Sequence, residues 1–221
     1  MTRDGPVLDD DWDRCPTKEA VVSKVIIKVG GVSAVLAGAL IICQAVADVA
    51  IQDSMQRGMV AAAFRSGSAL LLVFGLIGMH LRQQYSAGVF GEIATLVALL
   101  GSVTMFATSL PEATILPALP KDSPLLDQPP ATLLPVLIGS FVVYVVGLLL
   151  FGVAAWRARV LPRPAAVVLV TGVLLGAAAA PIVPGILALI GIALIWLGAA
   201  TVAPVRSVPS AANERTLVTQ A

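Results

Sequence analysis

Several polar side chains stand inside or at the edges of long apolar stretches, where a charged group is costly and is therefore a candidate for function. Gln44 and Asp48 are four residues apart, so they share one face of a helix. Arg65 lies within the next apolar stretch, and Glu112 directly follows the third. An ion pair between Asp48 and Arg65, joined by Glu112, would lower the cost of burying these charges. With Tyr144, in the middle of the fourth stretch, these residues form a candidate outer polar pocket.

A second polar group contains His80, Arg82 and Glu92, around the turn between the second and third apolar stretches. We call it the inner rim. A histidine there could exchange protons near neutral pH. The alternative interpretation is a rim of polar side chains that face the lipid headgroups.

The sequence lacks the motifs of common reactive sites. It contains no GxxxxGK[ST] loop for nucleotides, no HExxH pair for zinc and no DDxxD motif for prenyl diphosphates. Cys15 stands in a polar tail and Cys43 in an apolar stretch, so we expect neither a disulfide nor a metal site formed with the single histidine. No basic stripe for nucleic acid is present. We therefore predict no catalytic residue, no metal and no cofactor.

The composition indicates that lipid surrounds most of the chain. Of its 221 residues 58% are hydrophobic and only 12% are charged, with a mean hydropathy of +0.95. Soluble domains carry about 25% charged residues, so this chain has too few to cover a water-exposed surface. We predict an all-α bundle of transmembrane helices, with the lipid bilayer as its main partner.

Six apolar stretches predict six transmembrane helices within a membrane domain at residues 25–203. Polar tails precede and follow this domain at 1–24 and 204–221, the first predicted to be disordered, and a loop with six prolines occupies 111–132. The predicted spans are 25–47, 59–81, 89–110, 133–155, 165–180 and 182–202.

The fifth stretch is the weakest of the six predictions. It has 16 residues between Pro164 and Pro181, which is short for a span. Gly172 and Gly176 give it a face of small residues suited to close helix packing. A re-entrant hairpin, and with it a five-span topology, stays open as an alternative.

The first stretch has an alternative as well, because Ala45-Val46-Ala47 resembles a signal-peptide cleavage site. The apolar stretch is about twice as long as a typical signal core, and its leader is acidic, so a retained anchor is favoured.

The distribution of basic residues predicts the orientation. With six spans and a cytoplasmic N-terminus, eleven of the fourteen Lys and Arg residues lie on the cytoplasmic side. Arg57, Arg65 and Lys121 lie outside. The positive-inside rule therefore favours an arrangement with both termini in the cytoplasm.

Two segments resemble small six-helix membrane proteins of actinobacteria that belong to domain-of-unknown-function families. They read GLIGMHLRQQ…GVFGEIATLVALLG and VVGLLLFGVAAWRARVLPRPAAVVLVTGVLLG, and the resemblance covers roughly residues 65–200. It implies a multi-pass protein of the bacterial inner (plasma) membrane. It transfers no functional residue.

Three functions are compatible with these patterns. The first is a non-enzymatic protein that binds a lipid, a hydrophobic small molecule or a partner protein through the outer pocket, covered by the proline-rich loop. The second is a membrane enzyme for an isoprenoid or lipid, with Asp48 or Glu112 as acid–base groups. The third is a small transporter subunit that forms a homo-oligomer through the Gly172 and Gly176 face. If the pocket has no function, Arg65 extends to the headgroups and the acids are solvated.

Overall fold

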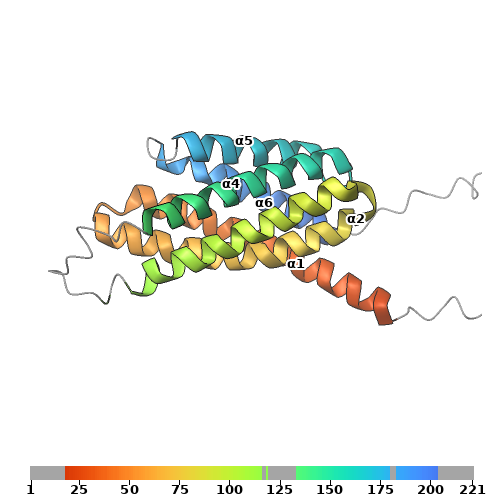
Figure 1. Ribbon diagram of the computed structural model, residues 1–221, viewed down its shortest axis with the longest axis horizontal. Helices are drawn as coiled ribbons and strands as arrows, with labels where there is room; N and C mark the ends of the chain where they lie inside the picture. The colour runs from red at the N-terminus through yellow and green to blue at the C-terminus, as the bar shows by residue number, and fades with distance from the viewer. Residues whose placement is uncertain (1–17, 116–117, 119–132, 180–182, 204–221) are drawn as a thin grey trace, which may run out of the picture.

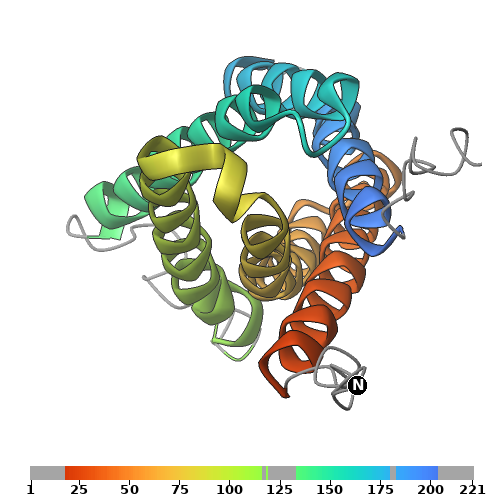
Figure 2. The ribbon, with the colours of Figure 1, turned by 90° about the vertical axis from the view of Figure 1, so that its right-hand side faces the viewer.

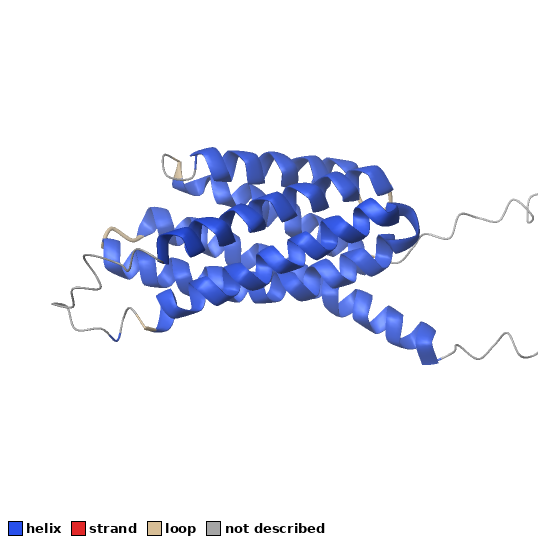
Figure 3. Ribbon diagram, in the orientation of Figure 1, coloured by secondary structure: helices blue, strands red, loops and turns tan. Residues whose placement is uncertain are grey.

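The part of the chain described by the computed structural model is entirely helical apart from short turns, and no strand occurs in it (Figure 3). It covers residues 18–115, 118, 133–179 and 183–203. The helices lie lengthwise beside one another in an elongated bundle (Figure 1). They are α1 (Lys18–Ala50), α2 (Ser54–Thr114), α4 (Leu133–Ala158), α5 (Arg163–Ala179), the 3-10 turn η3 (Pro184–Leu187) and α6 (Ala188–Val202).

Helix α2 consists of two antiparallel segments that reverse at Gly88. This glycine has φ 57° and ψ −168°, a left-handed conformation that residues with a Cβ rarely adopt. Arg65 and Glu112, 47 positions apart, form an ion pair across the two segments, which a continuous helix would not allow. Gly88 therefore converts one long helix into a helical hairpin (Figure 2).

The bundle has two ends, which we name after residues in them. At the Gly88 end lie the start of α1, the turn from α4 to α5 and the end of α6. At the Leu133 end lie the turn from α1 to α2, the end of α2 and the start of α4 (Figure 1).

Neighbouring helices pack in a closed ring, in the order α1, first segment of α2, second segment of α2, α4, α5 and α6, which returns to α1 (Figure 2). Large side chains fill the centre of the ring towards the Gly88 end. The fully buried members of this core include Leu72, Leu76, Phe151, Leu169, Leu194 and Leu197.

The outward faces of the helices are also apolar. Large exposed side chains such as Leu96, Val136, Val167 and Ile192 occur on different helices. Four helical segments are long and apolar enough to cross a membrane, namely Val22–Ala50, Ser54–Thr114, Leu134–Ala158 and Gly185–Val202. An apolar exterior over an apolar interior is expected of a protein whose solvent is lipid.

Several helix boundaries differ from the predicted spans; α6, for example, begins at Ala188, after the 3-10 turn η3, and not at 182. Two further differences have a cause in the local sequence. α1 begins at Lys18, so residues 18–24 of the predicted disordered tail are helical; they continue the helix because the segment KEAVVSK contains neither glycine nor proline. α2 continues through Pro111 to Thr114 instead of ending before the proline. Pro111 lacks the N–H that would bond the carbonyl of Ala107, but helical bonding continues after it: Ile115 N donates to Pro111 O, and Thr114 Oγ1 to Leu110 O.

The remainder of the predicted loop 111–132, apart from Ile115 and Ala118, lies outside the described residues, as do residues 1–17 and 204–221. The predicted cover over the pocket therefore lies outside the described residues.

The fifth apolar stretch, the weakest of the six predictions, forms α5, which packs lengthwise against α4 and α6 (Figure 1). With 17 residues it is about 25 Å long. Gly172 and Gly176 are buried and face residues 187–190 of η3 and α6, so the small-residue face is occupied within the same chain.

Glycines set the distances between the helix axes. A Cβ on Gly30 of α1 would lie 2.5 Å from Gly78 Cα of α2, and a Cβ on Gly78 would lie 2.6 Å from Gly30 Cα. α1 meets α6 in the same manner, since a Cβ on Gly191 would lie 2.6 Å from the carbonyl oxygen of Gly38. Lipid gives no hydrophobic drive for helix association, so such close backbone contacts supply the packing.

Substitution of Gly78 by alanine is expected to lower stability by about 2 kcal/mol, because its Cβ overlaps the α1 backbone, which cannot move aside as a side chain can. The matched control is Gly58→Ala in α2, where nothing lies within 4 Å; it should stabilise the helix by roughly 0.5–1 kcal/mol. Thermal unfolding in detergent measures both. Equal effects of the two substitutions would contradict the close crossing.

Candidate functional site

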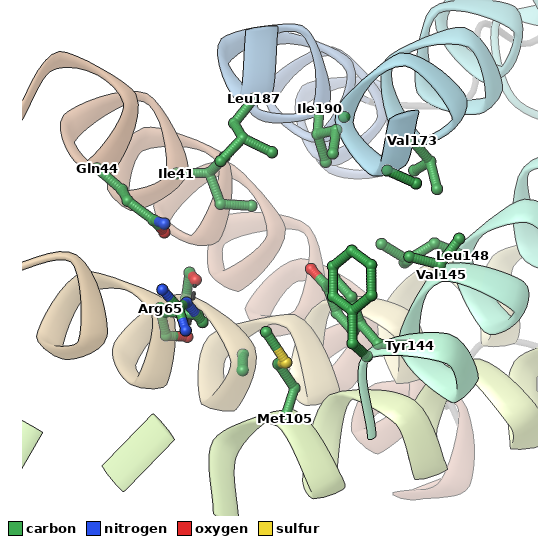
Figure 4. A pocket seen from close by; sticks show the side chains of 15 residues that line it. Ile41, Gln44, Arg65, Met105, Tyr144, Val145, Leu148, Val173, Leu187 and Ile190 are labelled. Carbon is green, nitrogen blue, oxygen red and sulfur yellow. Dashed lines mark hydrogen bonds between the residues drawn. The ribbon is translucent and has the colours of Figure 1, made fainter. Parts of the chain in front are cut away.

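One cavity, which we call the main cavity because it is enclosed by the ring of helices, lies in the half nearer the Leu133 end and has a volume of about 280 Å³ (Figure 4). Every helix of the ring contributes to its wall. Most of the lining is apolar and comes from Ile41, Ala69, Met105, Phe141, Val145, Leu148, Val173, Gly176, Ala177, Leu187 and Ile190. Its volume is just below the roughly 300–1,000 Å³ typical of small-molecule sites.

Four polar side chains complete the wall of the main cavity: Gln44, Arg65, Ser68 and Tyr144. The Ser68 hydroxyl is already used, since it donates to the Arg65 carbonyl at 3.0 Å. Gln44 is only 7% exposed and makes no hydrogen bond to another described residue. Figure 4 shows Gln44 and Arg65 on the same side of the cavity, with Tyr144 across from them. The cavity therefore combines an apolar wall with a few groups available to a polar ligand head.

Arg65 is held at the edge of the cavity by Glu112. Its Nη1 donates to Glu112 Oε2 at 3.2 Å, and both side chains are about one-third exposed (33% and 31%). A single guanidinium nitrogen is used in this pair, so the remaining donors of Arg65 are available to an anion. The pair closes the open end of the α2 hairpin.

A side groove of about 310 Å³ lies beside the cavity, between the second segment of α2 and the first turns of α4. It shares Arg65, Met105 and Phe141 with the cavity wall, and Glu112 lines it as well. The start of α4 that borders it is largely exposed. The groove therefore runs from the outer surface of the bundle to the edge of the cavity.

The structure brings together four of the five predicted pocket residues. Gln44, Arg65 and Tyr144 line the cavity, and Glu112 pairs with Arg65. Asp48 is half-buried near the end of α1 and forms no ion pair with a described residue, so the predicted pairing of Asp48 with Arg65 is wrong. Arg65 pairs with Glu112 instead because the reversal at Gly88 brings the two ends of the hairpin together.

The inner rim does not form one cluster. His80 Nδ1 lies 3.1 Å from Thr95 Oγ1 across the α2 hairpin. Arg82 instead reaches α6, where Nη1 donates to the carbonyl oxygens of Thr201 and Ala203. Glu92 is exposed and makes neither a hydrogen bond nor an ion pair with a described residue.

Arg82 therefore caps the C-terminus of α6, a role that sequence reasoning did not identify. The last carbonyls of a helix have no partner within it, and a cation is favoured there by the helix dipole. The contact spans 119 positions, so no local pattern signals it.

Among the described residues, no group of three or more His, Cys, Asp or Glu side chains could hold a metal ion. Cys43 is a free, exposed thiol on α1. Cys15 lies outside the described residues. The cavity wall itself contains no carboxylate.

Reversing either charge of the Arg65–Glu112 pair should destabilise the protein, and reversing both should restore stability. Arg65→Glu and Glu112→Arg each place like charges together, whereas the double variant rebuilds the pair. We expect a coupling of about 1 kcal/mol, because the pair is partly exposed and therefore screened. A double-mutant cycle of thermal unfolding measures it; additive losses would show that the pair contributes nothing.

Substitution of Arg82 by methionine should loosen the end of α6. It keeps a long apolar stem but removes the donors to Thr201 and Ala203, at a cost of about 2 kcal/mol for charged hydrogen bonds. Hydrogen exchange at the amides of residues 197–203 should accelerate, and Arg57→Met, an exposed arginine of α2, serves as control. Unchanged protection would refute the capping role.

Comparisons of the chain with protein-family models, with curated proteins and with solved structures gave no match in any of the three cases. The resemblance to actinobacterial six-helix membrane proteins therefore stays a prediction.

Proposed function

We propose that this protein binds an amphipathic small molecule, such as a lipid with a single apolar chain, in the main cavity. The observation that carries the proposal is a hollow in the ring with apolar walls and one guanidinium at its edge. The apolar part of the ligand would occupy the space between Met105, Leu148 and Ile190. An anionic or hydrogen-bonding head would contact Arg65 and Gln44.

Burial of an apolar chain in this cavity is favourable by roughly 25 cal/mol per Å² removed from water. The polar groups fix the orientation. The Gln44 amide lines the cavity and makes no hydrogen bond to another described residue, so it is available to a ligand or to water. The side groove offers a lateral path from the bilayer to the main cavity. Three residues, Arg65, Met105 and Phe141, line both the groove and the cavity.

In this proposal the chain crosses the bacterial inner membrane six times, with both termini in the cytoplasm. The two segments of α2 count as two spans, and α5, although short, is the fifth. Of the nine Lys and Arg residues in the described helices and turns, seven lie towards the Gly88 end, and the other two, Arg57 and Arg65, towards the Leu133 end. The positive-inside rule then puts the Gly88 end in the cytoplasm and makes the cavity face outward.

The other two functions have less support. A membrane enzyme would need acid–base groups at its substrate, and the cavity wall has no carboxylate. A transporter would need a polar path between the two ends, but Leu72, Phe151 and Leu197 fill the ring between the cavity and the Gly88 end. A binding protein requires neither feature.

Ala177→Phe should abolish binding of a single-chain anionic amphiphile, for which oleate is the probe. Ala177 lines the cavity and is itself exposed, so the larger ring can enter the cavity without overpacking the core. Oleate at a hundredfold excess over its Kd should stabilise the wild type by about 2.7 kcal/mol. The thermal shift should vanish in Ala177→Phe and persist in the matched control Ala178→Phe, an exposed neighbour outside the cavity wall.

The head specificity is checked with oleylamine, which has the same chain and the opposite charge. Arg65 disfavours a cation at the edge of the cavity, so oleylamine should stabilise the wild type less than oleate does. Equal shifts for oleate in wild type and Ala177→Phe would contradict the proposed cavity.

A further inference from the structure

A second concave site lies at the Gly88 end, where α4 turns into α5. Its volume is about 360 Å³, and its wall is formed by Trp156, Arg157, Arg159 and Arg163. We call it the arginine pocket. It shares no residue with the main cavity, so its function does not depend on the function proposed above.

The fold positions each of these side chains. Leu161 is buried in the core at 3% exposure, which fixes the middle of the turn, while Arg159 and Arg163, two residues before and after it, are exposed. Arg157 lies over the ring of Phe90 at 5.5 Å from its centroid, a cation–π contact that ties the end of α4 to the α2 hairpin. The three arginines therefore line one space.

Nothing in the described part of the chain neutralises this charge. The single ion pair there is Arg65–Glu112, at the other end of the bundle, and the exposed Glu92 pairs with none of the arginines. Arg163 also begins α5, whose first turn contains no acidic residue, so the positive end of the helix dipole adds to the same field. An anion in the pocket would relieve this repulsion.

We propose that the arginine pocket binds a phosphate or phosphodiester group. Guanidinium groups match the tetrahedral oxygens of phosphate with paired hydrogen bonds. Trp156 is 52% exposed beside them, as expected of an indole at the level of lipid headgroups. Arg163 and Val167 are four residues apart on α5 and both exposed, so an acyl chain below a bound headgroup would lie along an apolar helix face.

Arg159 offers a variant that removes charge without a risk to folding. Its φ of 59° is left-handed, a conformation that glycine adopts more readily than arginine. Arg159→Gly therefore removes one guanidinium and should leave the melting temperature at or above that of the wild type. Arg163→Gln removes a second guanidinium group. The matched control is Arg57→Gln, because Arg57 is also exposed but lies near the Leu133 end.

The full chain is reconstituted into nanodiscs of phosphatidylcholine that contain phosphatidylglycerol as the anionic lipid. After transfer to detergent, native mass spectrometry measures the phosphatidylglycerol retained per protein. Each pocket arginine removed should lower retention about fivefold, whereas Arg57→Gln should retain as much as the wild type. In a parallel arm, the melting temperature is measured in detergent with inorganic phosphate and with chloride at equal ionic strength.

Loss of lipid retention in the pocket variants without a phosphate effect supports a lipid headgroup as the ligand. A phosphate-specific stabilisation that disappears in Arg159→Gly and Arg163→Gln supports a soluble phosphate compound. If the pocket variants retain lipid and respond to phosphate as the wild type does, or if Arg57→Gln loses as much, the arginine pocket is not a binding site.

Discussion

The close contacts of α1 with both α2 and α6 determine how the other helices are arranged. Gly30 meets Gly78 on one side of α1, and Gly38 meets Gly191 on the other. In lipid, where apolar side chains gain little by leaving their solvent, the helices associate through such backbone contacts. Because α1 is bound on both sides, the ring closes, and the ring determines where a hollow can exist.

The hollow follows from the sizes of the side chains along the ring. Towards the Gly88 end, Phe151 and several leucines meet at the centre and fill it. Towards the Leu133 end, small residues such as Ala69 and Gly176 leave the main cavity open. The same division separates the two candidate sites, with Arg65 near the cavity and the arginine pocket at the opposite end. One end is thus suited to an apolar ligand with a polar head, and the other to an anion at the membrane surface.

Hydropathy was sufficient to predict the helices but not their packing. The described residues of the six apolar stretches are helical apart from Val183, and the turn near Gly88 and the short fifth segment occur where the sequence indicates them. Which face of each helix points inward could not be predicted, because the helices are apolar all round and show no amphipathic period. Phe141 and Phe151 look alike in the sequence, yet one borders the cavity and the other is fully buried. Glu112 pairs with Arg65, 47 positions away in the sequence, and Arg82 bonds to Thr201, 119 positions away. No local sequence pattern indicates contacts at such separations.

We propose that an amphipathic molecule binds in the main cavity and not on the apolar exterior. Photo-crosslinking with a diazirine-labelled fatty acid, followed by peptide mapping, tests it directly. Binding in the cavity should give labelling at residues such as Ile41, Met105 and Tyr144, and excess unlabelled fatty acid should abolish that labelling. Labelling spread evenly over lipid-facing residues such as Leu96 and Val136, unaffected by competitor, would contradict it.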